Sequence, residues 1–310
     1  MQPHEFPRCG HFFAARISLC VRLLLEELLI MNIKITSDST CDLTRDYLDA
    51  HGVDILPLYI NLGGKSYRDS VDIVPEDIYR HVSAGGDISK TAAVNVEDYE
   101  ACFSRYSTQY DAVVHINLGA EFSSCHQNAR IAAEAYPNVY PVDSCNLSSG
   151  HGQVVMEAVA LAEAGLEPAE IAARLQSFVS RVDASFLLNQ LEYLHLGGRC
   201  STVAALGANL LKLKPCIEVQ DGKMRVGKKY RGAYEKALLE YTRDRLSGPQ
   251  ARNARRILVV STACPPELVD MVCAEVERLT GQAPTARPLA GCTIASHCGP
   301  STIGIMFVQD

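Results

Sequence analysis

The amino-acid sequence predicts an α/β protein with two domains, a mostly parallel sheet in the first and a mixed set of helices and strands in the second. Short β-branched runs alternate with segments of helical period from residue 32 onward. The 310 residues, 47% of them hydrophobic, can bury about two cores of ordinary size. No repeat or low-complexity linker divides the chain, and we expect domains at 32–180 and 181–310.

Residues 1–31 are treated separately as an extension. Their apolar part, "ISLCVRLLLEELLI", resembles the core of a signal peptide but carries Arg22, Glu26 and Glu27, so it is too short and too charged to span a bilayer. Because Met31 directly precedes the first predicted strand, we interpret the segment as the product of a start assigned too early. The alternative is an amphipathic helix with an apolar face of Leu24, Leu25, Leu28 and Leu29.

The predicted elements of the first half follow from residue types and from the glycines and prolines that mark turns and helix ends. "NIKITS" predicts a strand, and the next segment predicts a turn and a helix that ends at Gly52. "VDILPLYINLGGKSYRDS" predicts two strands joined by a Gly-Gly turn, and a helix should run from Pro75 to Gly85. Two strand-and-helix units follow, "DAVVHINL" into "SSCHQNARIAAEA" and "NVYPVDS" into "GQVVMEAVALAEAG".

The second half begins with "ASFLLNQLEYLHLGGR" and a predicted helix over 201–213. "KPCIEVQDGKMRVGKKY" predicts a hairpin, because Asp221-Gly222 favours a two-residue turn. The rest predicts a helix over 233–246, a strand over 255–262, a helix over 266–279 and the closing segment "CTIASHCGPSTIGIMFVQ".

Charge and cysteine usage exclude some classes of function. The net charge of -7 and the pI near 5.7 argue against nucleic acid as the partner, because its binders need a basic surface. The twelve cysteines are scattered, without a C-x-x-C pair or paired histidine spacing, so we expect no metal. Reduced thiols in the cytoplasm are the simpler interpretation.

The stretch "NLGAEFSSCHQNARIAAEA" places Ser123 and Ser124 at or near a helix N-terminus that follows a strand. Such hydroxyls cap free backbone N–H groups, and the same position in an open α/β sheet also binds anions, so both roles stay open. A nucleophile elbow would need G-x-S-x-G, which is absent. Cys125 and His126 are neighbours on a helix and should diverge, which weakens a nucleophilic pair.

Three other stretches carry polar candidates. "DISKTAAV" offers Thr91 ahead of a helix that Asn95 could cap, and "YLHLGGRCST" offers Arg199 after two glycines. "TIASHCGPSTIG" offers His297, where a loop histidine with satisfied hydrogen bonds is the default interpretation. Taken singly, each is compatible with a purely structural role.

Together and in this order, these segments resemble the DegV family. The resemblance covers Asn32 to Asp310 and lies in "ITSDSTCDL", "KTAAV", "EFSSCHQNA" and "PVDSCNLSSGHG", then in "YLHLGGRCS", "KPCIEV", "DGKM", "KKYRGAYEKAL" and "SHCGPSTIG". The extension before Met31 has no counterpart in it.

The resemblance implies a fatty-acid-binding protein, the B subunit of a bacterial fatty acid kinase, with its lipid site between the two domains. It implies no catalysis by this chain and no cofactor: a separate ATP-dependent kinase subunit phosphorylates the bound carboxylate. The carboxylate would be held by Thr91 and Ser123, with Ser124 beside them, and the acyl tail would lie in an apolar tunnel. Arg199, Arg231 and His297 would lie near the carboxylate or meet the kinase subunit.

Departures from the family pattern and two rival functions remain. Ala92 stands where a serine is usual, and Ser124 and Cys125 stand where Gly-Thr is usual. One rival is an enzyme in its own right, a hydrolase using Ser123 or a phosphotransferase using His297. The other is a binding module for a different amphiphilic lipid. A cytoplasmic lipid carrier would also make transient contact with a membrane surface.

Overall fold

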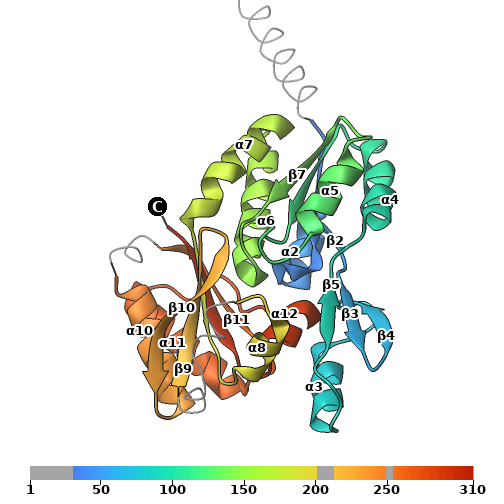
Figure 1. Ribbon diagram of the computed structural model, residues 1–310. Coiled ribbons are helices and arrows are strands. Elements are labelled where there is room, and N and C mark those ends of the chain that lie inside the picture. The colour runs from blue at the N-terminus through green and yellow to red at the C-terminus, as the bar shows by residue number, and fades with distance from the viewer. Residues whose placement is uncertain (1–30, 201–212, 249–253, 310) are drawn as a thin grey trace, which may run out of the picture. The chain divides into compact units, whose positions relative to one another are not determined.

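A computed structural model describes residues 31–200, 213–248 and 254–309 (Figure 1). Except for their last residues, Met31 and Leu213, the predicted extension over 1–31 and the predicted helix over 201–213 lie outside these residues. Contacts group Ile33–Asp310 into one unit, which is described below, and the division at residue 180 stays a prediction.

A four-stranded parallel sheet forms the first layer, with strand order β2-β1-β6-β7. The strands are β1 Ile33–Asp38, β2 Asp54–Leu56, β6 Ala112–Asn117 and β7 Val139–Asp143. The helices after them are α2 Arg45–Ala50, α4 Val96–Ser107, α5 Cys125–Ala133, α6 Ser148–Glu163 and α7 Pro168–Phe178. Helices α4 and α5 pack together, α6 and α7 pack together, and the two pairs lie on either side of the sheet (Figure 1). The predicted parallel sheet is confirmed.

A small antiparallel sheet of order β4-β3-β5 is inserted between β2 and α4. Its elements are β3 Tyr59–Leu62, β4 Lys65–Arg68, α3 Pro75–Ser83 and β5 Lys90–Ala92. The predicted Gly-Gly turn joins β3 to β4, and both glycines have positive φ, 57° and 77°, which other residues rarely adopt. Thr91 pairs with Ile60 in this sheet.

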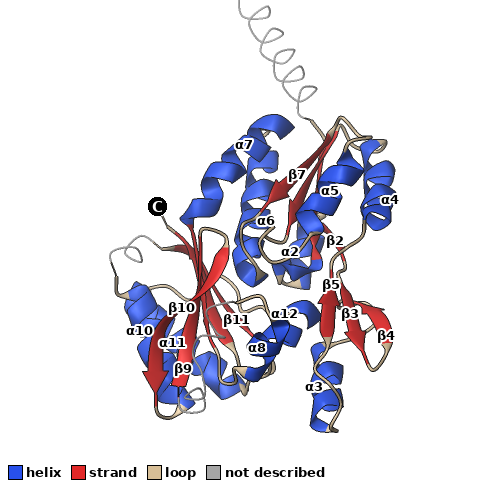
Figure 2. Ribbon diagram, in the orientation of Figure 1, coloured by secondary structure: helices blue, strands red, loops and turns tan. Residues whose placement is uncertain are grey.

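A five-stranded antiparallel sheet of order β10-β9-β8-β12-β11 forms the remaining part (Figure 2). Its strands are β8 Val182–Leu187, β9 Leu213–Gln220, β10 Lys223–Arg231, β11 Arg255–Ser261 and β12 Ile303–Val308. The helices are α8 Glu192–Gly197, α10 Tyr234–Leu246, α11 Pro266–Thr280 and α12 Cys292–Cys298. Asp221-Gly222 forms the predicted hairpin turn, with φ of 51° and 73°.

The start of α6 differs from the sequence prediction. The helix was predicted as "GQVVMEAVALAEAG", from Gly152, whereas it begins at Ser148. A side chain at Gly152 would place its Cβ 2.5 Å from the carbonyl oxygen of Cys41, so the close approach of two backbones requires this glycine. Glycine here marks packing rather than the end of a helix.

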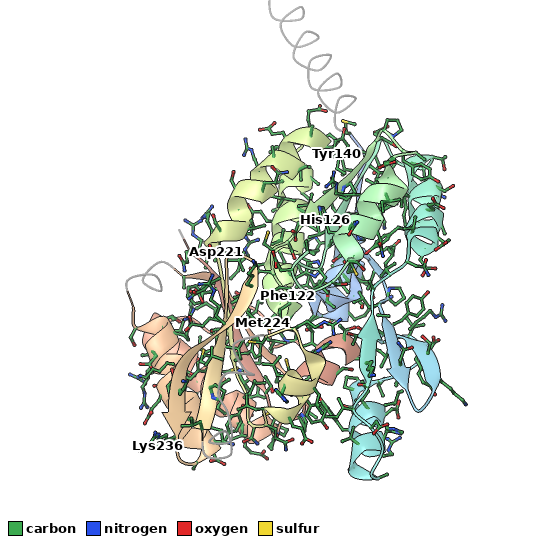
Figure 3. The ribbon with its side chains drawn as sticks, viewed as in Figure 1. Phe122, His126, Tyr140, Asp221, Met224 and Lys236 are labelled. Atoms are coloured by element: carbon green, nitrogen blue, oxygen red, sulfur yellow. The ribbon has the colours of Figure 1, made fainter. Side chains whose placement is uncertain are left out.

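The hydrophobic core connects the parallel sheet with the five-stranded sheet. One cluster of buried side chains includes Val114 on β6, Phe186 on β8 and Met306 on β12. A second cluster lies where α10 and α11 cover the other side of the five-stranded sheet. Phe122 and Met224 also belong to the first cluster, and Figure 3 shows them close together.

Candidate functional site

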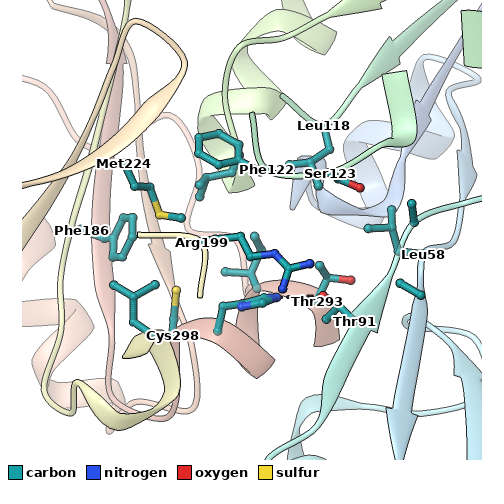
Figure 4. A pocket seen from close by; sticks show the side chains of 16 residues that line it. Leu58, Thr91, Leu118, Phe122, Ser123, Phe186, Arg199, Met224, Thr293 and Cys298 are labelled. Carbon is teal, nitrogen blue, oxygen red and sulfur yellow. Dashed lines mark hydrogen bonds between the residues drawn. The ribbon is translucent and has the colours of Figure 1, made fainter. Parts of the chain in front are cut away.

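A narrow cavity lies among the three sheets (Figure 4). Most of its lining is apolar: Leu58, Ala92, Ala93, Leu118, Phe122, Leu147, Phe186, Leu194, Met224, Ile294 and Cys298. The polar side chains are Thr91, Ser123, Arg199, Thr293 and His297. The cavity is therefore an apolar chamber with a few polar groups, as is usual for small-molecule sites.

Thr91 and His297 meet at the polar end of this cavity. Thr91 lies on β5 and His297 in the last turn of α12, and the Thr91 Oγ1 and His297 Nε2 atoms are 2.8 Å apart. The default interpretation of His297 as a loop histidine was wrong, because the helix extends to Cys298 before Gly299 ends it. Two residues 206 positions apart in sequence thus share one hydrogen bond.

The His297 imidazole is neutral near pH 7. Burial and, to a lesser extent, the positive charge of Arg199 lower its pKa to about 4. The buried Nδ1 atom has no hydrogen-bond partner among the described residues. It lies against Gly197, where a Cβ would come within 2.3 Å of it, so only glycine fits at this position.

Arg199 supplies positive charge at the mouth of the cavity. It follows α8 and the left-handed Gly198, and its exposed side chain donates from Nη1 to the carbonyl oxygen of Gly197 at 2.9 Å. Figure 4 shows the guanidinium extending toward Thr91. An anion at this end of the cavity would therefore lie near a cation and a hydroxyl.

Ser123 lines the cavity and also caps α5. Its Oγ accepts a hydrogen bond from the backbone N–H of Cys125 at 3.3 Å and lies 3.2 Å from the Cys125 sulfur. The capping role is thus present, and the hydroxyl still borders the chamber. Ser124 is exposed, makes no capping hydrogen bond and does not line the cavity.

Cys125 and His126 diverge as predicted. Cys125 is buried, and burial raises the pKa of its thiol to about 12, so it carries no thiolate at pH 7. His126 Nδ1 instead lies 3.2 Å from Oδ1 of Asn117. Arg231, at the end of β10, is exposed and does not line this cavity.

A buried carboxylate, which the sequence analysis did not single out, holds the loop that leads to Ser123. Asp38, at the end of β1, accepts hydrogen bonds from the hydroxyl of Tyr99 at 2.6 Å and from the backbone N–H of Leu118 at 2.7 Å. Its Oδ1 lies 3.1 Å from Nε2 of His115. Burial alone raises the pKa of Asp38, but His115 and Tyr99 hold it below the usual value. The position of Asp38 directly after a buried strand was the only signal in the sequence.

Two more buried carboxylates fix the start of α12. Asp69 accepts from the backbone N–H of Cys292 at 2.8 Å and from the hydroxyl of Thr293 at 2.7 Å. Asp42 accepts from the backbone N–H of Gly291 at 2.8 Å and from the hydroxyl of Ser148 at 2.6 Å. Burial raises the pKa of Asp42 to about 7. The helix that carries His297 is thus anchored to the turn after β1 and to the loop after β4.

Two features are absent from the described residues. No group of three or more histidine, cysteine or acidic side chains is placed to hold a metal ion there. No helix within that part of the chain is long and apolar enough to cross a membrane.

Comparison with known proteins agrees with this geometry. A family model described as "uncharacterised protein, DegV family" matches residues 32–310. A DegV domain-containing protein of Caldanaerobacter subterraneus is 29% identical over 279 residues, which are 89% of this chain and 99% of the relative. A structure described as fatty acid binding of a DegV family protein from Thermus thermophilus is 30% identical, with a TM-score of 0.80 over 90% of this chain and 100% of the other. A stearic-acid-binding protein of Eubacterium ventriosum is 27% identical, with a TM-score of 0.78 over 89% and 98% of the two chains.

Proposed function

The chain belongs to the DegV family, and from this premise we propose that it binds one long-chain fatty acid in the cavity described above. The acyl tail lies along the apolar lining, and the carboxylate lies at the end where Thr91 and Ser123 present hydroxyls. The observation that carries the proposal is this polarity, an apolar chamber with a hydroxyl, a histidine and an arginine at one end.

The energetics assign different tasks to the tail and the head. Burial of a saturated chain of about sixteen carbons contributes roughly 12 kcal/mol, at about 0.8 kcal/mol per methylene. Association and ordering cost about 4 to 15 kcal/mol. Each hydrogen bond to the charged carboxylate adds only about 1.5 to 3 kcal/mol. Tail burial therefore supplies most of the affinity, and Thr91 and Ser123 orient the head.

The hydrogen bond between Thr91 and His297 suits a hydroxyl that donates to a carboxylate. If the neutral His297 carries its proton on Nε2, it donates to Thr91 Oγ1, and the threonine hydrogen is free to point at the ligand. The unpartnered Nδ1 is consistent with this tautomer, since a bare ring nitrogen costs less there than an unpaired N–H would. In this arrangement the His297 Nε2–H group donates to Thr91, and the Thr91 hydroxyl donates to the carboxylate of the ligand.

We further propose that this chain presents the bound carboxylate to a separate ATP-dependent kinase subunit and catalyses nothing alone. Arg199 is exposed at the mouth, where its positive charge would face a transferring phosphoryl group, and the neutral His297 beside it would help to position that group. Arg231 and Ser124 lie outside the cavity and are proposed only as contacts of that partner.

The rival enzyme functions have less support in the described residues. The hydrogen bonds of Ser123 go to Cys125 rather than to a histidine, so no general base is aligned to activate it as a hydrolase nucleophile. The His297 Nε2 atom is bonded to Thr91 and the Nδ1 atom is buried, whereas a phosphotransferase histidine must expose a ring nitrogen to its donor. Another amphiphilic lipid could also occupy this cavity, and identification of the bound ligand distinguishes that alternative from fatty acid binding.

The test is lipid extraction and mass spectrometry of the purified protein, followed by delipidation and uptake of palmitate or oleate. We expect about one fatty acid per chain and saturable uptake. Phe122→Asp places a charge in the apolar lining and should abolish uptake, whereas Ile131→Asp changes an exposed side chain outside the cavity and serves as the control. Absence of fatty acid together with absence of uptake would refute the carrier function.

A further inference from the structure

The loop over 118–124, here called the cavity loop, joins β6 to α5 and gives Leu118, Phe122 and Ser123 to the cavity wall (Figure 4). Strand β6 lies between β1 and β7 in the parallel sheet, so the cavity loop leaves the sheet between the ends of two neighbouring strands. On the β1 side, Asp38 accepts the N–H of Leu118. The other side of the loop meets the end of β7.

Asp143, the last residue of β7, holds the cavity loop from that side. Its Oδ1 atom accepts a hydrogen bond from the N–H of Ala120 at 3.1 Å and another from the N–H of Cys145 at 2.8 Å. The N–H of Gly119 donates to the carbonyl oxygen of Asn146 at 2.9 Å. A Cβ at Gly119 would come within 2.9 Å of the Asn146 nitrogen, so glycine is required for this close approach. These contacts join the cavity loop to the turn after β7.

We propose that Asp143 is a positioning residue for the head group: by fixing the cavity loop, it holds the Ser123 hydroxyl where it donates to the carboxylate of the ligand. The proposal rests on the proposed function, because Ser123 must contact that carboxylate. Asp143 does not line the cavity and therefore acts through the loop. It belongs to "PVDSCNLSSGHG", a segment of the family resemblance to which the proposed function gives no other task.

The connection between Asp143 and Ser123 is short. Ala120, which Asp143 holds, is three positions before Ser123. The chain between them is closed into a turn, because the N–H of Phe122 donates to the carbonyl oxygen of Gly119 at 2.9 Å. A displacement of the loop at Ala120 is therefore passed on to the hydroxyl.

The Ser123 hydroxyl is suited to donate to an anion from this position. Its oxygen accepts the N–H of Cys125 at 3.3 Å, which keeps the oxygen at the start of α5. Its hydrogen has the Cys125 sulfur, at 3.2 Å, as its acceptor in the described part of the chain. Because sulfur is a weak acceptor, a carboxylate in the cavity should replace it.

Asp143 can be changed with less damage than Asp38, which is fully buried and bonded to several side chains. The Asp143 side chain is half-buried and Ala120 is exposed, so in Asp143→Ala water can bond to the freed N–H of Ala120. Asp143→Asn keeps an acceptor oxygen and is the matched conservative variant. Asp143→Glu keeps the charge but moves the acceptor by one methylene.

The experiment measures the ratio of palmitate affinity to hexadecanol affinity for the delipidated full chain. Ser123→Ala should lower this ratio about tenfold, because a carboxylate loses a stronger hydrogen bond than an alcohol does. Asp143→Ala and Asp143→Glu should each lower it about fivefold, whereas Asp143→Asn should stay within about twofold of wild type. The use of two disruptive variants keeps the test valid if one of them does not fold.

Double variants show whether Asp143 acts through Ser123. Ser123→Ala/Asp143→Ala should have the ratio of Ser123→Ala alone, because the hydroxyl that Asp143 positions is already absent. Thr91→Val/Asp143→Ala should combine both single losses, since Thr91 lies on β5 rather than on the cavity loop.

Two results would overturn the inference while the proposed function stands. One is binding of palmitate with a wild-type ratio in the folded Asp143→Ala or Asp143→Glu variants. The other is a further loss of the ratio when Asp143→Ala is added to Ser123→Ala, which would indicate a general loosening of the site. If wild type binds no fatty acid, the inference and the proposed function are both overturned.

Discussion

Removal of the Thr91 hydroxyl should reduce selectivity for an acid over the corresponding alcohol. In Thr91→Val a carboxylate loses one charge-assisted hydrogen bond, which costs about 1.5 to 3 kcal/mol, whereas a neutral alcohol loses about 0.5 to 1.5 kcal/mol. The ratio of palmitate affinity to hexadecanol affinity should therefore fall about tenfold. The His297 Nε2 atom also loses its partner, but this change is present in the protein with either ligand, so it largely cancels from the ratio.

The assay is competition of palmitate and of hexadecanol against a fluorescent fatty acid analogue. Thr293→Val is the matched control, because Thr293 also lines the cavity but its hydroxyl donates to Asp69. Thr293→Val removes only the side-chain hydrogen bond to Asp69 and keeps those from the backbone N–H groups of Cys292 and Thr293, so it should lower stability slightly and leave the ratio unchanged. If Thr91→Val weakens both ligands equally, the carboxylate does not bind at Thr91 and the orientation of the ligand assumed here is wrong.

Three further predictions concern charge and position. The folded-state pKa of His297, about 4, lies below its usual 6.5, so between these two pH values the unfolded chain binds more protons than the folded one. The free energy of unfolding should therefore fall by up to about 3 kcal/mol as the pH falls through this range. Denaturant titrations at several pH values should show a smaller pH dependence for His297→Gln. Arg199→Ala should keep its bound fatty acid but no longer support acyl-phosphate formation when a matching kinase subunit and ATP are added. If the variant instead loses the fatty acid and still supports full acyl-phosphate formation, the role proposed for Arg199 is wrong. Asp69→Asn should lower both the melting temperature and the ratio of palmitate affinity to hexadecanol affinity, because it weakens the hydrogen bonds that hold the start of α12. A lower melting temperature with an unchanged ratio would show that Asp69 contributes to stability alone.

Local sequence signals predicted most of the fold. Alternation of β-branched and helical segments predicted the parallel sheet, and Gly63-Gly64 and Asp221-Gly222 predicted both hairpin turns. These features are determined by residues close together in sequence, so a short stretch of sequence is enough to predict them. The start of α6 was missed because Gly152 is required by a contact with Cys41, which is 111 positions away.

The site was only partly predictable for the same reason. Ser123, Thr91, Arg199 and His297 were each noted as polar candidates in their own sequence stretches, and the resemblance to a family grouped them into one site. The carboxylates of Asp38, which holds the cavity loop, and of Asp69 gave no local signal, because their partners are backbone N–H groups far away in sequence. Arg231 is the opposite case: the resemblance placed it with Arg199 and His297, which line the cavity, whereas Arg231 does not line it.

The position of Asp69 also explains why ligand binding should depend on the whole unit rather than on one part of it. Its carboxylate accepts hydrogen bonds from Ser39 in the turn after β1, from Ser70 beside the small sheet and from Thr293 on α12. The same small sheet carries Thr91, and the same helix carries His297. Head-group geometry therefore exists only when these three segments have come together, and a fatty acid that binds this geometry stabilises all of them at once. Since a ligand specific for the folded state adds RT ln(1 + [L]/Kd) to the free energy of unfolding, the proposed fatty acid should stabilise the whole unit when it binds.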